Sequence, residues 1–291
     1  MKIQDTTKTI GRNTLNLYFS LMTSNKNLNT IAENYNTDKF DHGYTKIYEK
    51  YFESLRDQKL KILEIGIADG KSLLMWSDYF KNSLVIGIDI HQINIEEKKL
   101  NRANINVHQG SQSDKKFIEE IIKEYKQFDI IIDDGSHLAK DVKKSFELLF
   151  PALKDDGLYV IEDVQTSYNH FFGGNPFDLK YSNSHMNFFK QLTDSLNYQE
   201  IANPFYIEKK YDGKITNISF YHNMIFVRKG NNDAQSREVI KHSYEDMKFI
   251  EKSKRTGKKL QYFIKYKIFY KTYTLFLFVF NTIKKLLLFR I

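Results

Sequence analysis

Five short apolar segments, each ending in glycine or in an acidic or polar residue, alternate with helical patterns between residues 61 and 162. The apolar segments are 61–66, 84–89, 105–109, 128–133 and 157–162. Helical spacing of apolar residues occurs at 72–80, 94–101, 114–125 and 142–153. This alternation is typical of βαβ units, which build a parallel sheet with helices on both faces. Further β-type stretches at 204–211 and 215–228 predict an antiparallel C-terminal hairpin that closes a mostly parallel α/β sheet.

The loop after the first apolar segment reads Glu64-x-Gly66-x-x-x-Gly70. Glycines in such a turn let the backbone come close to a ligand, and parallel sheets bind ligands at the carboxyl ends of their strands. The loop lacks the G-x-G-x-x-G fingerprint of dinucleotide binders, because Ala68 and Lys71 stand at the second and third glycine positions. A pyrophosphate site is therefore disfavoured, and with it a NAD-dependent oxidoreductase.

Acidic residues accompany this loop at the same predicted edge of the sheet. Asp89 ends the second apolar segment, where a carboxylate can accept hydrogen bonds from both hydroxyls of a ribose. Glu64 suits a cationic ligand better than a phosphate. The combination resembles the class I S-adenosylmethionine-dependent methyltransferases and implies their Rossmann-like sheet and their cofactor. The residues expected at the cofactor are Glu64, Gly66, Gly70, Asp89, Ser111 and Asp133.

Two acidic pairs end the fourth and fifth apolar segments. One is Asp133-Asp134, followed by Gly-Ser-His137, and the other is Glu162-Asp163. Four carboxylates that converge without partners would repel and raise each other's pKa, and a divalent cation removes that difficulty. The chain has no cysteine, so disulfides and thiolate sites are excluded, and oxygen ligands of this kind suit Mg²⁺. A histidine beside such a site is a candidate general base.

The amino-acid sequence around these acids resembles the macrolide-sugar O-methyltransferase family. The matching segments are N-T-D-K at 36–39, H-G-Y-T-x-x-Y-E at 42–49, L-E-I-G at 63–66, D-D-G-S-H at 133–137, L-F-P at 149–151, G-L-Y-V-I-E-D at 157–163, Q-T-S-Y at 165–168, F-Y-H-N at 220–223 and V-x-K-G at 227–230. The resemblance implies that Asp134, Glu162 and Asp163 hold Mg²⁺ and that His137 is the catalytic base. A cephalosporin-hydroxylase-like group shares much of this text and is a further candidate.

These motifs predict a metal-dependent transfer of a methyl group to a sugar. Mg²⁺ would chelate two vicinal hydroxyls and lower the pKa of one, His137 would remove its proton, and the oxygen would displace the methyl group from the sulfonium. Tyr168, His170 and residues 221–222 are candidates for acceptor contacts or for packing, and residues 38–39 for a flap over the cofactor. A non-catalytic methyltransferase-like binding module is the alternative of another class.

Basic residues are concentrated at the C-terminal end of the chain. Residues 252–291 hold eleven lysines and arginines and no acid; with Glu251 the segment accounts for +10, so residues 1–250 carry −2 of the net +8. This distribution argues against a nucleic-acid-binding face. The longest uncharged run, 272–283, has 12 residues, whereas a membrane span needs roughly 20. We therefore expect residues 252–291 to lie on an anionic membrane surface or to pack on protein.

The predicted organisation is an N-terminal helical arm or cap at 1–58, a methyltransferase domain at 59–232 and a basic, aromatic-rich helical tail at 233–291. Residues 1–16 lack the apolar core of a secretory signal, which predicts a cytoplasmic protein, with the tail on the inner face of the membrane.

The family's large N-terminal domain is missing from this sequence and a basic tail is added, and both differences argue against a macrolide acceptor. A sugar methyltransferase docked on the inner membrane would suit a lipid-linked glycan, so the expected acceptor is a glycan or glycolipid. A bacterial surface glycan such as capsule or lipooligosaccharide is the main prediction, and a secondary-metabolite glycoside is its alternative. A homo-oligomer is left open.

Overall fold

A computed structural model describes residues 27–96, 98–201 and 206–232. Contacts group the chain into two compact units, one formed by 1–198 with 205–233 and the other by 199–204 with 234–291. The description below concerns the described residues of the first unit. The predicted tail at 233–291 lies outside the described residues, and the predicted domain boundaries stay predictions. Within the described part of the chain, no helix has the length and apolar character required to span a membrane.

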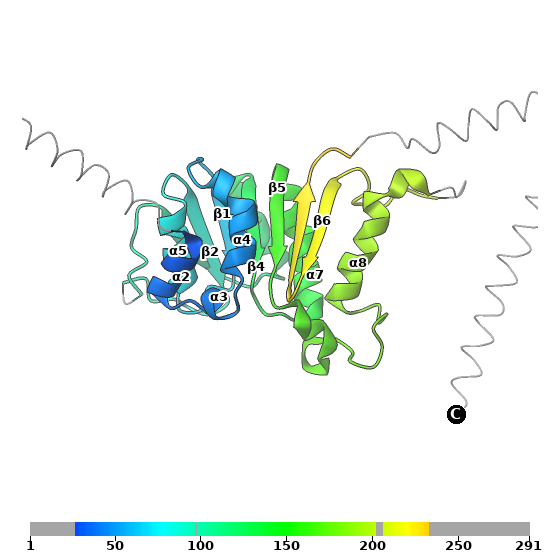
Figure 1. Cartoon of the computed structure of the whole chain (residues 1–291), viewed down its shortest axis with the longest axis horizontal. Coiled ribbons are helices and arrows are strands. Elements are labelled where there is room, and N and C mark those ends of the chain that lie inside the picture. Colours follow the sequence, from blue (N-terminus) through cyan, green and yellow to red (C-terminus); the bar gives the residue numbers. More distant parts are fainter. Residues whose placement is uncertain (1–26, 97, 202–205, 233–291) are drawn as a thin grey trace, which may run out of the picture. The chain divides into compact units, whose positions relative to one another are not determined.

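A seven-stranded sheet with the order β3-β2-β1-β4-β5-β7-β6 forms the centre of this unit (Figure 1). The strands are β1 (Lys61–Ile65), β2 (Leu84–Asp89), β3 (Ile105–Gln109), β4 (Phe128–Asp133), β5 (Leu153–Ile161), β6 (Ile215–Tyr221) and β7 (Met224–Lys229). Strands β1 to β5 pair in parallel, whereas β7 is antiparallel to both β5 and β6. The predicted mostly parallel sheet with a C-terminal hairpin is confirmed.

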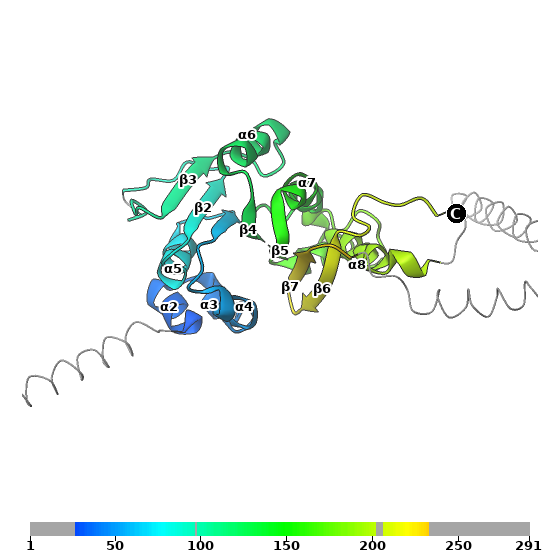
Figure 2. The same cartoon turned by 90° about the horizontal axis from the view of Figure 1, so that it is seen from above.

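Helices cover both faces of the sheet, with α2 to α5 on one side and α6 and α7 on the other (Figure 2). The α-helices are α2 (Leu28–Tyr35), α3 (Asp38–Asp41), α4 (Thr45–Phe52), α5 (Lys71–Tyr79), α6 (Lys115–Tyr125), α7 (Ala139–Leu149) and α8 (His185–Leu196). The 3₁₀ turns are η1 (Glu53–Leu55), η2 (Phe150–Ala152), η3 (Val164–Tyr168), η4 (His170–Phe172) and η5 (Tyr198–Glu200). The two faces bury two separate apolar cores.

Aromatic side chains of α4 and α5 anchor the N-terminal helices to the first core. Tyr48 and Phe52 stack on each other and meet Trp76 edge-on, and all three rings are fully buried. Each large apolar side chain buried in this way contributes about 1.5–3 kcal/mol. This packing fixes α3, the short helix between α2 and α4, against the carboxyl edge of the sheet.

Two segments differ from the sequence prediction. Residues 94–101 were expected to form a helix, but the described residues there form turns, with Lys99 at a positive φ of 57° and Leu100 buried against Gly70. Tertiary burial of one leucine here outweighs a weak helical pattern. The β-type pattern at 204–211 forms no strand among its described residues, 206–211.

Candidate active site

The acidic pairs meet where three neighbouring parallel strands end. Strand β4 lies between β1 and β5, with Asp133 opposite Ile65 on one side and Ile161 on the other. Asp134 and Glu162 therefore follow adjacent strands at the carboxyl edge, as the sequence predicts. Asp163 comes next, with a left-handed φ of 51° that turns the chain into η3.

Strand alternation sends the two members of the first pair to opposite faces. In β4, Ile130 and Ile132 belong to the core under α2 to α5, and Ile131 belongs to the core under α6 to α8. Since successive strand residues point to opposite faces, Asp134 is directed toward α3, whereas Asp133 is directed toward α7. By the same alternation, Glu64 in β1 and Glu162 after β5 are directed toward the face that carries Asp134.

The Lys39 ammonium lies at the centre of the acids on the α3 side. Its Nζ is 2.7 Å from Asp134 Oδ2, 2.8 Å from Glu162 Oε1 and 3.3 Å from Glu64 Oε1. The lysine side chain is 1% exposed. Burial works to lower the pKa of Lys39, but the three carboxylates outweigh it and raise that pKa well above its ordinary value. Lys39 is therefore a permanently charged, fully buried cation.

Two tyrosines of the same N-terminal segment also donate hydrogen bonds to the acids of this edge. Tyr44 donates a hydrogen bond of 2.6 Å to Asp163 Oδ1, and Tyr48 donates to Glu162 Oε1. Neither was identified from the sequence as a site residue, although both stand in the H-G-Y-T-x-x-Y-E segment. Their spacing puts them on one side of α4, which is the signal that could have revealed them.

The acids on the α3 side carry more negative charge than Lys39 alone can balance. Burial, with the charge of Asp134, raises the pKa of Glu162 well above its ordinary value despite Lys39. Burial also raises the pKa of Asp134 and of Glu64, again against the effect of Lys39. When all three acids are ionised, Glu64, Asp134 and Glu162 together with Lys39 leave two negative charges, and a divalent cation would offset that charge and favour the ionised acids.

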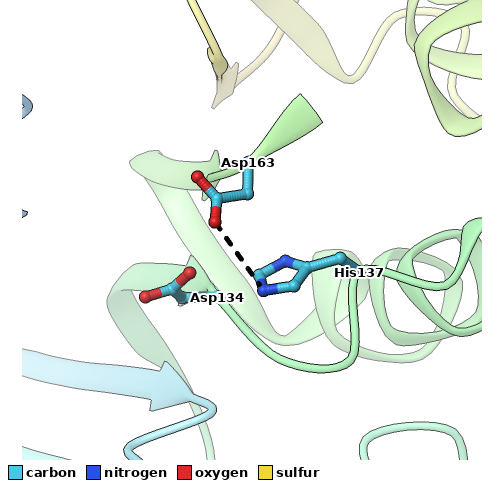
Figure 3. A group of neighbouring side chains, drawn as sticks. All are labelled: Asp134, His137 and Asp163. Atoms are coloured by element: carbon cyan, nitrogen blue, oxygen red, sulfur yellow. Dashed lines mark ion pairs between the residues drawn. The ribbon is translucent and has the colours of Figure 1, made fainter. Parts of the chain in front are cut away.

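Among the described residues, Asp134, His137 and Asp163 form a group whose ligand atoms all lie within 4.8 Å of one another (Figure 3). His137 Nε2 is 3.8 Å from Asp163 Oδ2. Burial works to raise the pKa of Asp163, but hydrogen bonds from Tyr44 and Gln165 outweigh it and lower that pKa. Two carboxylates and an imidazole are oxygen and nitrogen donors that can hold Mg²⁺ or a similar ion.

Glu162 takes a different position from the other two predicted metal ligands. Its Oε1 accepts from both Lys39 and Tyr48, and its side chain is 2% exposed. The described metal-type group contains His137 in its place. The predicted ligand set of Asp134, Glu162 and Asp163 stays a prediction, as does the role of His137 as base.

A cavity of about 470 Å³ opens beside this group. Three of the residues expected at the cofactor line it, namely Gly66, Asp89 and Ser111, and so do Asp134, His137 and Asp163. Gly66 has φ of 78°, and a Cβ there would lie 2.2 Å from the carbonyl oxygen of Asp134. Only glycine allows the loop after β1 to pass so close to the loop after β4.

Asp89 holds the glycine loop in place. Its Oδ2 accepts hydrogen bonds from the backbone N–H groups of Ile67 and Ala68 at 3.0 and 3.1 Å. Its Oδ1 accepts from His91 N–H. The carboxylate that is predicted to bind a ribose thus also holds the glycine loop that follows β1.

The other three residues expected at the cofactor do not line the cavity. Glu64 is fully buried and accepts from Ser72, and Gly70 is the N-cap of α5 beneath Leu100. Asp133 is 1% exposed and lies on the α7 side of the sheet. The side chains of Glu64 and Asp133 are buried on opposite faces of the sheet, and Gly70 has no side chain. Their contribution to cofactor binding stays a prediction.

Asp133 instead organises the turn that carries His137. It accepts from Ser145, Tyr159 and Gln112, and Gln112 Oε1 accepts from Ser136 N–H at 2.7 Å. Burial raises the pKa of Asp133 to about 6 although these hydrogen bonds oppose the shift. Gln112, which lines the cavity floor, was missed by sequence reasoning.

The acceptor candidates lie around the same edge. Tyr168 is 40% exposed and His170 is exposed, whereas Tyr221 contacts Tyr51 through their hydroxyl groups at 3.0 Å. His222 is exposed at the tip of the β6–β7 hairpin. These positions leave Tyr168, His170 and His222 available for an acceptor and give Tyr221 a packing role.

Comparison with protein families matches residues 63–164 to a methyltransferase domain. Two curated proteins are similar over about 70% of this chain. The mycinamicin VI 2''-O-methyltransferase of Micromonospora griseorubida is 36% identical over 216 residues, 71% of this chain and 53% of that protein. A tetracenomycin-C 3'-O-methyltransferase of Streptomyces olivaceus, whose substrate name includes a 2-methoxy-rhamnosyl group, is 33% identical over 70% of this chain and 54% of that protein.

A solved methyltransferase structure is also similar to this chain. The MycE methyltransferase of the mycinamycin pathway, in complex with Mg and SAH, matches with a TM-score of 0.67 at 35% identity. The match covers 72% of this chain and 56% of that one. A second structure of the same protein also contains mycinamycin VI. The chain spans about half the length of the curated relatives it matches.

Proposed function

We propose that this chain transfers a methyl group from S-adenosylmethionine to a sugar hydroxyl, because residues 63–164 match a methyltransferase domain and the chain is similar to the mycinamicin VI 2''-O-methyltransferase. The observation that carries the proposal is the convergence of Asp134, His137 and Asp163 beside a cavity lined by Gly66 and Asp89. One edge of the sheet thus offers a cofactor pocket and a metal-type group together.

The proposed acceptor is a sugar of a secondary-metabolite glycoside. The similar proteins are named for acting on macrolide and tetracenomycin glycosides. A bacterial surface glycan, the main expectation from the sequence, has no counterpart among these relatives, and the tail on which that expectation rested lies outside the described residues. The comparisons therefore favour the alternative acceptor.

S-adenosylmethionine is proposed to occupy the cavity at the ends of β1, β2 and β3. The loop at Gly66 would pass close to the methionine part, and Asp89 would accept from the ribose hydroxyls. Ser111 and Gln112 line the same cavity on the β3 side, where the adenine is expected. The Ser111 hydroxyl can donate to or accept from an adenine edge, and Gln112 Oε1 has a second lone pair beside the bond from Ser136 N–H.

Asp134, Glu162 and Asp163 are the proposed ligands of Mg²⁺. When bound, the ion would act as a Lewis acid that lowers the pKa of the acceptor hydroxyl. His137 Nε2 takes the hydroxyl proton, and Asp163 at 3.8 Å stabilises the resulting imidazolium. The acceptor oxygen bonds to the methyl carbon while the carbon–sulfur bond breaks, and the electron pair of the carbon–sulfur bond stays on sulfur. A neutral thioether and a methyl ether result, with the proton on His137.

A direct assay tests this function. The full chain is incubated with S-adenosylmethionine, Mg²⁺ and either mycinamicin VI, demethylmacrocin or a rhamnosyl tetracenomycin, and each product is analysed by mass spectrometry. We expect one glycoside to gain a single methyl group on its sugar, and the gain to be lost with EDTA or with Asp134→Asn. Methylation of purified capsule or lipooligosaccharide instead would overturn the acceptor, and transfer that survives EDTA would overturn the metal.

The binding-module alternative makes a different prediction in the same experiment. A non-catalytic module would bind SAH in a calorimeter but would leave all acceptors and S-adenosylmethionine unchanged. The presence of Asp134, His137 and Asp163 in one group favours the enzyme.

A further inference from the structure

We propose that Lys39 is a positioning residue that holds Asp134 and Glu162 in the geometry required by the proposed metal site. The metal itself rests on the proposed function, whereas the arrangement around Lys39 is a property of the fold. Nothing in the sequence patterns assigns Lys39 this role, because its partners Glu64, Asp134 and Glu162 lie at the ends of three different strands.

The first step is that the ammonium is itself held rigidly. Lys39 belongs to α3, which follows Asn36 at a left-handed φ of 51°. The backbone carbonyl of Lys39 accepts from Tyr44 N–H at 3.0 Å, and Thr37 N–H donates to Ala32 at 3.2 Å. The lysine side chain is 1% exposed and its Nζ contacts three carboxylates, so Nζ has little freedom to follow a moving carboxylate.

The second step is that the carboxylates have few other restraints on this side. Lys39 and Tyr48 both bond Glu162 through the same oxygen, Oε1. Asp134 is bound through Oδ2 at 2.7 Å. In both acids the Lys39 contact thus uses one oxygen and leaves the second outside this set of bonds. An ammonium placed in this way orients the second oxygen of each acid.

The third step separates positioning from direct contact. Lys39 is not among the residues that line the cavity, although its neighbour Asp38 is. At 1% exposure, Nζ cannot reach a ligand in that cavity without displacing an acid. Any effect of Lys39 on catalysis therefore passes through Asp134 and Glu162.

A competing interpretation gives Lys39 only a structural role as counter-ion of Glu64, which is fully buried. A buried carboxylate without a partner is strongly unfavourable, so such a role alone would explain a lysine here. The two interpretations differ in what happens when Glu64 and Lys39 are neutralised together. A pure counter-ion then becomes dispensable, whereas a positioning residue does not.

The test measures metal and cofactor binding rather than turnover. Mn²⁺ replaces Mg²⁺ as the probe, and its binding to the full chain is followed by electron paramagnetic resonance of the free ion. SAH binding is measured by calorimetry. The variants are Lys39→Met, the double variant Lys39→Met with Glu64→Gln, and the control Lys46→Met, which removes an exposed lysine of α4.

Loss of a partner that orients a metal ligand typically weakens metal affinity about 10- to 100-fold. We expect Lys39→Met to weaken Mn²⁺ binding by that factor and to change SAH affinity less than about threefold, since Lys39 does not line the cavity. The double variant should melt nearer to the wild-type temperature and still bind Mn²⁺ weakly. Lys46→Met should leave both affinities unchanged.

Unchanged or tighter Mn²⁺ binding in Lys39→Met would overturn the positioning role, because tighter binding would mean that the ammonium only repels the metal. Recovery of Mn²⁺ affinity in the double variant, or failure of both variants to fold, would leave Lys39 a structural counter-ion and also overturn it. A wild-type chain that binds SAH but no Mn²⁺ would instead refute the metal in the proposed function.

Discussion

Replacing Asp133 by asparagine is expected to remove one component of the pH dependence of stability. Asp133 is buried between β4 and α7, with Oδ2 accepting from Ser145 and Tyr159 and Oδ1 from Gln112. The carbonyl of Val142 lies 3.1 Å from Ser145 Oγ as a second possible acceptor for its single hydroxyl hydrogen. If that hydrogen turns to Val142, an asparagine amide can donate one hydrogen to Ser145 Oγ and the other to the Tyr159 hydroxyl oxygen, which lies 3.0 Å from Oδ2 in the wild type.

The magnitude follows from the shifted pKa. Burial raises the pKa of Asp133 from 3.8 to about 6, even though its hydrogen bonds favour the ionised form. About two pKa units correspond to roughly 3 kcal/mol. A raised carboxyl pKa means that the folded protein binds more protons than the unfolded chain, so stability falls as the pH rises from about 4 to about 6. An asparagine side chain cannot ionise, so this loss should be absent in the variant.

Urea unfolding at pH 4, 6 and 8 in metal-free buffer measures the difference. We expect Asp133→Asn to gain up to roughly 3 kcal/mol on the wild-type chain between pH 4 and pH 8. The exposed Asp155→Asn is the control for loss of an acid in solvent. SAH affinity should be unchanged in Asp133→Asn, because Asp133 does not line the cavity. A variant whose difference from wild type is the same at all three pH values would refute this reasoning, and lost SAH binding would restore Asp133 as a cofactor residue.

Three further changes test the site. Gly66→Ala should destabilise the fold by at least about 1–3 kcal/mol in urea, because its Cβ would meet the Asp134 carbonyl at 2.2 Å at a positive φ; wild-type stability would contradict this close approach. His137→Ala should slow methyl transfer by about 10²- to 10⁴-fold in a single-turnover assay yet keep Mn²⁺ binding, and lost Mn²⁺ binding would make His137 a ligand rather than the base. Tyr44→Phe removes a charge-assisted hydrogen bond to Asp163 and should lower the free energy of unfolding by about 1.5–3 kcal/mol above pH 4. The loss should be smaller below pH 4, because a carboxyl of lowered pKa stabilises the fold only while it is ionised. A pH-independent difference in urea unfolding would argue against that bond.

The sheet could be predicted from the sequence because its signals are local. Each of the first five strands is a short apolar run that ends at the carboxyl edge, and parallel topology then places those ends together. This is how Asp134, Glu162 and Asp163 could be assigned to one edge without a structure. Strand alternation is also local, and it places Asp133 and Asp134 on opposite faces of the sheet.

The N-terminal contribution could not be predicted because it depends on tertiary packing. Lys39 meets Asp134 and Glu162 only because α4 and α5 share an aromatic core that brings α3 to the sheet edge. In the sequence Lys39 is one lysine among many, and no periodicity marks it as buried. The flap over the cofactor that the sequence suggests at 38–39 stays a prediction: Asp38 lines the cavity, whereas the Lys39 side chain bonds the acids.

This arrangement explains why sequence motifs at 36–49 and at the ends of β4 and β5 resemble the same family. Acids at the ends of β4 and β5 would repel one another in a core that has only apolar surroundings. Lys39, Tyr44 and Tyr48 each donate to one or more of those acids, so the segment supplies hydrogen bonds that the sheet cannot. The residual negative charge is left for a bound ion. A sheet with the acids but without this segment would have to protonate them, and it would then lose the ligands on which the proposed chemistry depends.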